Sequence, residues 1–431
     1  DIGVISGALP FIAKQFKAGT EMQELVVSSL LVGAVIGTLL SGMLSRKYGR
    51  KNTLLVSAVV FALGSLLSAV SLSTNMLMMV RVFLGMAVGI ASFTAPLYLS
   101  EMAPYRIRGA LISMYQLMIT IGILGAYISD TALSYGGHWR TMLGILVIPS
   151  SLMFLGILFL PKSPRWLVLA GKKQNAREVL KKLRYEDEVE AELIDIEKTL
   201  ERKQNGLQLL MQSKQFRKAL FLGIGLQAVQ QFTGMNVVMY YAPKIFKLAG
   251  FASTSQAMWG TVLVGLINVL ATFIAIAFVD RVGRKPILFI GFIVMGLSMG
   301  TLGLMFHIGM QASQIIQYAA IGALLVFIIG FAMSAGPIIW VICSEIFPLT
   351  GRDLGITVST ATNWLCNAVV GATFLTMLTV LGPAHTFWLY GGLNVLFIAF
   401  LFLFVPETKG VSLEKIENNL MSGKRLVNIG Q

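Results

Sequence analysis

Apolar runs long enough to cross a lipid bilayer recur along the whole chain. A transmembrane helix needs about 20 predominantly apolar residues. In lipid every backbone amide and carbonyl must find its partner inside the protein, which a helix achieves within one segment. The sequence therefore predicts an all-α, multi-pass membrane protein, and a composition of 56% hydrophobic and 13% charged residues agrees. The complete runs cover 25–45, 53–72, 79–99, 110–130, 141–160, 219–242, 257–279, 287–307, 316–342, 354–381 and 386–405.

The first residues, "DIGVISGALPFIA", are apolar after Asp1 but too short to cross a bilayer alone. We interpret residues 1–13 as the second half of a twelfth span, whose first half precedes this sequence. The predicted architecture is therefore twelve transmembrane helices, the first of them truncated.

The net charge of +14 is distributed unevenly between the connections. Of 34 Lys and Arg residues, 28 fall in one alternate set of connections and the C-terminal tail, five in the other set, and one, Arg81, inside a span. Cytoplasmic loops carry such an excess of basic residues. We therefore expect both chain ends in the cytoplasm and contact with anionic lipid, and no nucleic acid partner.

Two motifs occur twice. "RKYGRK" at 46–51 recurs as "DRVGRK" at 280–285, and "SEMAPYRIRG" at 100–109 recurs as "SEIFPLTGR" at 344–352. Parallel repeats with a binding site between them at mid-membrane define one class of secondary transporters. The predicted domains are an N-terminal six-helix bundle (1–161), a cytoplasmic linker with short amphipathic helices (162–218), a C-terminal six-helix bundle (219–405) and a cytoplasmic tail (406–431).

Asp1 and Arg81 are the charges predicted to lie deepest in the membrane. An unpaired charge there costs at least about 2.5–3.5 kcal/mol, so each residue needs a partner, and the other is the obvious one. A carboxylate that loses an arginine in a desolvated site takes a proton more readily, whereas arginine keeps its own. Asp1 would then be the titrating member. A purely structural salt bridge is the alternative.

Acidic and basic residues also gather where spans meet the cytoplasm, with an acid and a base seven positions apart in both repeats. Such groups can bridge helices in one conformation and separate in another, which would form a latch between the bundles. Plain contact with water and lipid headgroups is the alternative. The acid and base pairs are Glu101 with Arg108 and Glu345 with Arg352.

Uncharged polar residues lie inside several spans, most densely in "QAVQQFTGMNVVMYY" at 227–241. Amides donate and accept hydrogen bonds, and aromatic rings cover the apolar face of a sugar, so the set suits a neutral polyhydroxyl ligand. For any single amide, a hydrogen bond between helices is an equally good explanation. The set comprises Gln116, Gln227, Gln230, Gln231, Asn236, Asn268, Trp340, Asn363, Trp364 and Asn367.

A regular helix could not direct all the polar residues of 227–241 at one ligand, because Asn236 and Tyr240 point away from the three glutamines. Glycine tolerates the backbone change that a helix break requires, which predicts a break at Thr233-Gly234. A second break is expected at Gly336-Pro337. Discontinuous helices are typical of transporter binding sites.

The sequence contains no phosphate-binding loop, no paired catalytic carboxylates and no metal-ligand spacing. We expect no enzymatic activity and no cofactor. Uphill transport would then draw on an ion gradient.

The chain resembles the sugar porters of the major facilitator superfamily, and among them the bacterial galactose-proton and arabinose-proton symporters. The motifs that carry the resemblance cover essentially the whole chain. They include "VRVFLGMAVG", "YLSEMAPYRIRG", "PKSPRW", "QQFTGMNVVMYYAPKIF", "DRVGRKP", "SAGPIIWVICSEIFPL", "STATNWLCNAVVGATF" and "VPETKGVSLEKIE".

The resemblance implies a major facilitator fold with two pseudo-symmetric halves and alternating access in a bacterial inner membrane. It further implies uptake of a neutral monosaccharide, of the galactose or arabinose class, together with a proton; we expect a monomer. Asp1 would couple the proton, with Arg81 as its partner. Gln116, Gln230, Gln231, Asn236, Asn268, Trp340 and Asn363 would contact the sugar, and Tyr241, Gly336 and Trp364 would shape its cavity. Arg50, Glu101, Arg108, Arg284, Glu345 and Arg352 would form the cytoplasmic gating network.

Two residues depart from the family pattern. Arg46 replaces the usual acid of the first signature loop, and Lys162 replaces the glutamate of "PESPR". Both changes remove an acid from the cytoplasmic network. Gln227 has no role implied by the resemblance.

Three other functions remain open from the sequence. A facilitative sugar uniporter would share the fold but has no evident need for Asp1. A proton-coupled drug exporter would share the fold too, but an amide-rich cavity favours hydroxyl-rich cargo. A membrane sensor that binds sugar without moving it would need a larger signalling domain than 162–218 offers.

Overall fold

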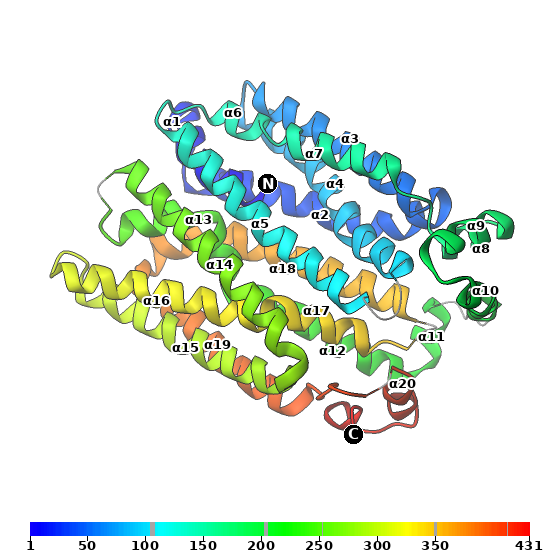
Figure 1. Cartoon of the computed structure of the whole chain (residues 1–431). Helices are drawn as coiled ribbons and strands as arrows, with labels where there is room; N and C mark the ends of the chain where they lie inside the picture. The colour runs from blue at the N-terminus through cyan, green and yellow to red at the C-terminus, as the bar shows by residue number, and fades with distance from the viewer. Residues whose placement is uncertain (104–107, 202–205, 252, 349–350, 412) are drawn as a thin grey trace.

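The structure is a computed structural model that describes residues 1–431 except 104–107, 202–205, 252, 349–350 and 412 (Figure 1). In the described part, ten helical segments are long and apolar enough to cross a membrane. They are α2 (Thr20–Tyr48), α3 (Arg50–Ala69), α4 (Thr74–Met102), most of α5 (Arg108–Ser134), α6 with α7 (Trp139–Gly144 and Val147–Phe159), most of α14 (Thr254–Val282), α15 (Arg284–Ile308), α16 with α17 (Gln314–Met333 and Ala335–Glu345), α18 (Arg352–Val380) and α19 (Gly382–Phe404).

Two predicted spans take another form. The first is the shorter apolar helix α1 (Ile2–Phe16). The continuous span expected at 219–242 is instead two helices, α12 (Lys214–Phe232) and α13 (Met235–Leu248), separated at Thr233 and Gly234. Gly234 has φ 93°, a left-handed conformation that only glycine adopts without strain. The predicted helix break at this position is confirmed.

The second predicted break is displaced. Helix α16 ends at Met333, and the irregular residue is Ser334, with φ −127° and ψ −89°. Gly336 and Pro337 lie in the first turn of α17, where proline is tolerated because an amide there has no intrahelical partner. The prediction of a break at Gly336-Pro337 was therefore wrong by two residues.

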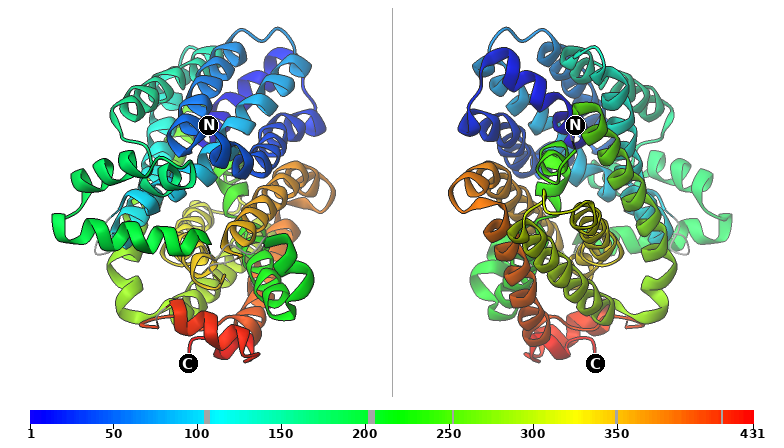
Figure 2. Two further views of the ribbon diagram at one scale, coloured as in Figure 1. Left: turned by 90° about the vertical axis from the view of Figure 1, so that its right-hand side faces the viewer. Right: turned by 90° about the vertical axis from the view of Figure 1, so that its left-hand side faces the viewer.

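The two ends of the molecule differ in their connections. At one end, which we call the basic end, lie the turns at Gly49 and Gly283, the segment 160–213 and the tail 405–431. At the other, the short-loop end, the connections cover 17–19, 70–73, 135–138, 249–253, 309–313 and 381. Figure 2 views the molecule from each end, with the basic end toward the reader on the left.

Short helices occupy the basic end. Three of them, α8, α9 and α10, share a small apolar core around Trp166, Leu180 and Ile196. The chain ends at the same end of the molecule in Figure 1, with α20, which packs on α12, and a 3-10 turn. These elements are α8 (Pro164–Leu169), α9 (Lys173–Leu183), α10 (Glu186–Glu201), α11 (Gly206–Gln212), α20 (Leu413–Met421) and the turn Leu426–Asn428.

The helices of residues 1–159 pack largely on one another, with α4 against α2 and α3, and α1 against α5. Among the later helices, α15 packs on α16 and α19, and α12 packs on α18. Three extended contacts join the two sets: α2 with α18, α5 with α14, and α1 with α13. In Figure 1, α5 and α14 run side by side through the middle of the molecule.

Helices α2 and α4 approach each other through glycine. A Cβ added at Gly33 would lie 2.0 Å from the carbonyl oxygen of Val82, and one at Gly85 would lie 1.9 Å from that of Leu30. Small residues at membrane helix contacts let two backbones touch in this way. The contact places Arg81, on α4, directly beside α2.

Candidate functional site

Asp1 and Arg81 form an ion pair inside the helical bundle. The Arg81 Nη2 and Asp1 Oδ2 atoms are 3.1 Å apart, and the two side chains are only 1% and 3% exposed. The Nε of Arg81 donates a second hydrogen bond, of 2.7 Å, to the carbonyl oxygen of Val26 on α2. The structure therefore brings together the two charges whose pairing the sequence predicted, and ties α1, α2 and α4 to one guanidinium.

The pair is not fully satisfied. Among the described residues, Asp1 Oδ1 and Arg81 Nη1 are buried and find no hydrogen-bond partner. Each unmade hydrogen bond in a buried charged group costs free energy. Asp1 Oδ1 can therefore still accept a hydrogen bond, and Arg81 Nη1 can still donate one.

The break between α12 and α13 brings two distant amides together. Gln231 lies in the last turn of α12 and Asn236 in the first turn of α13; the Asn236 Nδ2 donates to the Gln231 Oε1 over 2.5 Å. On a continuous helix these side chains would point in different directions. The break at Gly234 thus brings the Asn236 side chain against that of Gln231.

A second group of amides connects α12 to α17 and α18. The Gln230 Nε2 donates to the carbonyl oxygens of Ala335 and Gly336, at 2.8 and 3.0 Å. The Asn363 Nδ2 donates to the Oε1 atoms of Gln227 and Gln230, at 2.6 and 2.7 Å. The carbonyls that Gln230 reaches lie in the first turn of α17, just after the irregular residue Ser334. The predicted residues Gln230, Gly336 and Asn363 are therefore in one hydrogen-bonded cluster.

Gln227 is explained by this cluster. Its amide contacts Asn363 and the thiol of Cys343, 3.6 Å away, and both partners belong to other helices. This placement fits a residue whose side chain forms hydrogen bonds with neighbouring helices and does not bind a ligand.

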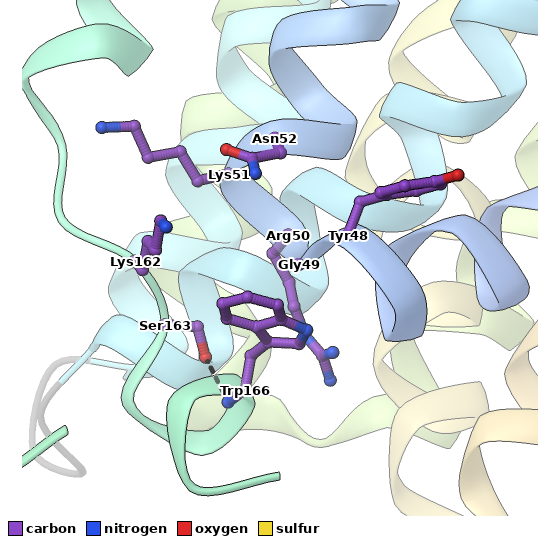
Figure 3. Close-up of a pocket in the computed structure, with 8 residues that line it drawn as sticks. All are labelled: Tyr48, Gly49, Arg50, Lys51, Asn52, Lys162, Ser163 and Trp166. Atoms are coloured by element: carbon purple, nitrogen blue, oxygen red, sulfur yellow. Dashed lines mark hydrogen bonds between the residues drawn. The ribbon is translucent and has the colours of Figure 1, made fainter. Parts of the chain in front are cut away.

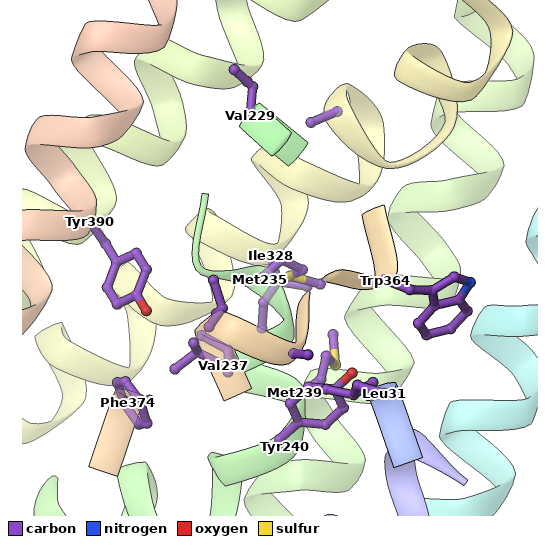
Figure 4. Close-up of a cluster of buried hydrophobic side chains, with 14 of the residues drawn as sticks. Leu31, Val229, Met235, Val237, Met239, Tyr240, Ile328, Trp364, Phe374 and Tyr390 are labelled. Carbon is purple, nitrogen blue, oxygen red and sulfur yellow. The ribbon is translucent and has the colours of Figure 1, made fainter. Parts of the chain in front are cut away.

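Aromatic residues surround the broken helix (Figure 4). The hydroxyl of Tyr241 donates to the carbonyl of Gly371 over 2.7 Å, and Tyr240 bonds Asn367 over 3.1 Å, so both rings are anchored to α18. Trp364, also on α18, donates its indole N–H to Ser92 of α4 over 3.2 Å. The apolar side chains around the break keep water from this part of the helix.

Three predicted sugar ligands lie apart from the hydrogen-bonded cluster. Gln116 on α5 and Trp340 on α17 are half-buried, and Asn268 on α14 is 5% exposed. Within the described part of the chain, no hydrogen bond engages any of these three side chains. Their polar atoms are thus not committed to helix packing.

At the basic end, the predicted gating residues form ion pairs within each set of helices. Glu101 accepts from Arg50 through Nε and Nη2, at 2.9 and 2.8 Å, and also from the hydroxyl of Ser163. Glu345 lies 3.4 Å from Arg284. Neither pair joins the helices of 1–159 to those of 214–404, so these pairs form no latch between the predicted bundles in this structure. Arg352 donates to the carbonyl of Phe347, and the side chain of Arg108 lies outside the described residues.

A shallow pocket opens beside the first turn of α3 (Figure 3). It lies at the basic end, away from the amides, and is therefore not the candidate sugar site. Its lining residues are Tyr48, Gly49, Arg50, Lys51, Asn52, Lys162, Ser163 and Trp166.

The two repeats differ at this turn. In the second repeat the Glu407 carboxylate accepts the amides of Arg284 and Lys285, at 3.1 and 2.9 Å, and so caps the start of α15. In the first repeat Lys162 lies near the start of α3 and offers no acceptor. The start of α3 therefore lacks the carboxylate cap that Glu407 supplies to α15.

Sequence reasoning missed two buried carboxylates. Glu24 on α2 is 3% exposed and accepts hydrogen bonds from Thr376 of α18. Asp130 on α5 is 2% exposed and lies against Gly7 of α1, and neither of its oxygens has a hydrogen-bond partner in the described part of the chain. Asp130 is the last residue of the apolar run 110–130, and an acid inside a predicted span was the available signal.

Comparison with known proteins shows the family to which this chain belongs. The family model described as "Sugar (and other) transporter" matches residues 1–420. The chain therefore belongs to the sugar transporter family, whose relatives found here are membrane transporters rather than enzymes.

Two curated relatives come from Escherichia coli strain K12. The chain is 60% identical to a galactose-proton symporter over 431 residues, which covers 100% of this chain and 93% of the relative. It is 53% identical to an arabinose-proton symporter over 433 residues, with 100% and 92% covered.

Among solved structures, the chain resembles the proton:xylose symporter XylE of the major facilitator superfamily, bound to 6-bromo-6-deoxy-D-glucose. The TM-score is 0.83 at 33% identity, over 97% of this chain and 94% of that one. XylE from E. coli in a partially occluded inward-open conformation gives the same TM-score at 31% identity, over 95% of each chain. The all-helical major facilitator fold is thus shown.

Proposed function

We propose that this protein carries a neutral aldose of the galactose or arabinose class across a bacterial inner membrane together with a proton. The proton gradient supplies the free energy, and no cofactor takes part. Sugar and proton bind in a state open to one side of the membrane and leave from a state open to the other.

The buried ion pair of Asp1 and Arg81 is the observation that carries the proposal. In the ionised pair the carboxylate is stabilised by the guanidinium. Protonation of Asp1 removes this attraction and frees Arg81 to take other acceptors. One proton moved through about 100 mV supplies about 2.3 kcal/mol, enough for roughly 50-fold accumulation of sugar.

The amides and aromatic rings around the helix break support a sugar as the cargo. We assign direct contact with sugar hydroxyls to Gln231 and Asn236, which face each other across the break, and to the uncommitted Gln116 and Asn268. Trp340 offers a ring face. Gln230, Asn363, Tyr241, Gly336 and Trp364 hold the broken helices in place and complete the cavity.

For the architecture, we propose twelve spans in two six-helix bundles, 1–161 and 219–405, joined by the linker 162–218 and followed by the tail 406–431. The contacts of α1–α7 among themselves, and of α12–α19 among themselves, support this division. The basic end faces the cytoplasm, in accordance with the distribution of Lys and Arg. The protein works as a monomer.

The test is sugar-driven alkalinisation outside sealed vesicles, measured for the wild type and for Asp1→Asn. Asparagine keeps the shape of the side chain but cannot exchange a proton. We expect the variant to lose proton movement and concentrative uptake while it retains exchange of labelled for unlabelled sugar. Proton movement at the wild-type rate would refute coupling through Asp1.

The same experiment separates the competing functions. A uniporter would equilibrate sugar with no pH change in the wild type. A sensor would bind sugar but move none of it into vesicles.

A further inference from the structure

The short-loop end contains a carboxylate that the proposed transport mechanism does not use. Glu24 lies in the second turn of α2 and is 3% exposed. Both of its oxygens accept hydrogen bonds from one residue of α18. The backbone amide of Thr376 donates to Oε1 over 2.7 Å, and the hydroxyl of Thr376 donates to Oε2 over 2.6 Å.

These two bonds are strong and come from one source. An O–H donor and an ionised carboxylate at this distance form a charge-assisted hydrogen bond, roughly twice as strong as a neutral one. None of the described ion pairs includes Glu24, and the hydrogen bonds described for its carboxylate both come from Thr376. If α18 moved away from α2, the Glu24 carboxylate would lose both of these hydrogen bonds at once.

The surroundings of Glu24 form the junction between the two sets of helices. One turn further along α2, Val27 and Leu31 approach Gly371 of α18, where an added Cβ would lie 3.5 and 3.3 Å from their methyl groups. The contact of Glu24 with Thr376 therefore lies at the outer edge of an apolar seam between α2 and α18.

Other hydrogen bonds also cross this junction toward the short-loop end. The Tyr127 hydroxyl of α5 donates to the carbonyl of Met239 on α13 over 2.8 Å, and the Trp259 indole bonds the hydroxyl of Tyr135 over 3.2 Å. The described ion pairs at the basic end, by contrast, stay within one set of helices. The molecule is thus tied across the junction at the short-loop end.

We propose that Glu24 and Thr376 form a gate contact that holds the short-loop end closed, and that they separate each time this end opens. The inference rests on the proposed function, because a symporter that works by alternating access must open its two ends in turn. The contact exists only when the short-loop end is closed. Its full free energy therefore favours the closed state of this end over the open state. It acts with no contribution from sugar contacts.

Removing either partner should raise the ratio of open to closed molecules at the short-loop end by about tenfold, the value expected for a loss of one charge-assisted hydrogen bond. Glu24→Gln removes the negative charge, so any hydrogen bonds that remain with Thr376 are neutral and weaker. Thr376→Val keeps the shape and the backbone amide but removes the hydroxyl.

The opening can be followed by the distance between two spin labels at the short-loop end. Ser73 before α4 and Ser313 before α16 are exposed, and each can be changed to cysteine and labelled. The background carries Cys366→Ser, while Cys343 is 3% exposed and stays unlabelled. We expect Glu24→Gln and Thr376→Val to increase the long-distance population, and Thr376→Ser to match the wild type.

Thr373→Val is the matched control. Thr373 lies one turn from Thr376 on α18, is exposed, and bonds only the Val369 carbonyl of its own helix. It should leave the distance distribution unchanged. The double variant of Glu24→Gln with Thr376→Val should open no more than the stronger single variant, because both remove one contact.

The proposed gate contact would be refuted if Glu24→Gln and Thr376→Val gave the same distance distribution as the control Thr373→Val. Full additivity in the double variant would also refute it. The measurement needs neither sugar nor a proton gradient. Failure of the Asp1→Asn experiment would therefore leave this inference standing, and failure here would leave proton coupling untouched.

Discussion

Replacing Gly234 with alanine should damage both stability and sugar binding, for two reasons that the structure separates. Gly234 begins α13 with φ 93°, and an L-residue in this left-handed conformation costs about 1–2 kcal/mol. The added Cβ would also lie 2.9 Å from the ring of Tyr390, which is 3% exposed and packed near Phe374. Overpacking of this kind costs about 1–3 kcal/mol. The expected loss is therefore about 2–5 kcal/mol.

Gly382 supplies the control. It also has a positive φ, 79°, but an added Cβ there meets no atom within 4 Å. Gly382→Ala should lose only the backbone contribution, about 1–2 kcal/mol. The difference between the two variants, about 1–3 kcal/mol, measures the contact with Tyr390. The free energy of unfolding can be obtained by titrating the protein in mild detergent with a denaturing one.

Sugar affinity provides the functional measurement. A displaced α13 would separate Asn236 from Gln231, so galactose should bind Gly234→Ala at least tenfold more weakly, by about 1.4 kcal/mol. Gly382→Ala should bind as the wild type does. Adding Tyr390→Leu to Gly234→Ala should recover part of the stability. Equal destabilisation by the two glycine variants, with unchanged affinity, would refute this account of the helix break.

Two further predictions concern the cap at the basic end and the amides of the broken helix. Glu407→Gln should cost about 0.5–2 kcal/mol of stability because the start of α15 loses its carboxylate cap, whereas Lys162→Glu should stabilise α3. A denaturing-detergent titration measures both changes; unchanged or higher stability of Glu407→Gln, or lower stability of Lys162→Glu, would contradict the capping account. Gln231→Ala and Asn236→Ala should each weaken galactose binding, measured by calorimetry, while the bundle stays folded. Gln227→Leu should lower the stability of the protein by about 1 kcal/mol and leave its affinity for galactose unchanged.

Several features of this protein follow from the sequence because they depend on neighbouring residues only. The length of each apolar run decides whether a segment can cross a bilayer. The break in the seventh predicted span follows from Gly234, since a left-handed residue is a local property of the backbone. The pairing of Asp1 with Arg81 joins residues 80 positions apart and was predictable for a different reason: two isolated opposite charges in lipid have few other partners.

The tertiary structure decided which distant residues meet. Glu101 pairs with Arg50 and Ser163, and Asn363 bridges Gln227 and Gln230, through side chains between 51 and 136 positions apart. Such contacts depend on the rotation and offset of each helix against its neighbours, which apolar length and periodicity leave undetermined.

The carboxylate of Glu24 illustrates the same limit most clearly. Nothing near Glu24 in the sequence indicates that Thr376, 352 positions away, supplies both of its hydrogen bonds. The hydrophobic pattern determined that α2 and α18 are membrane helices. Only the packed bundle determined that they meet at these two residues, because shape complementarity between whole helix faces fixes that register.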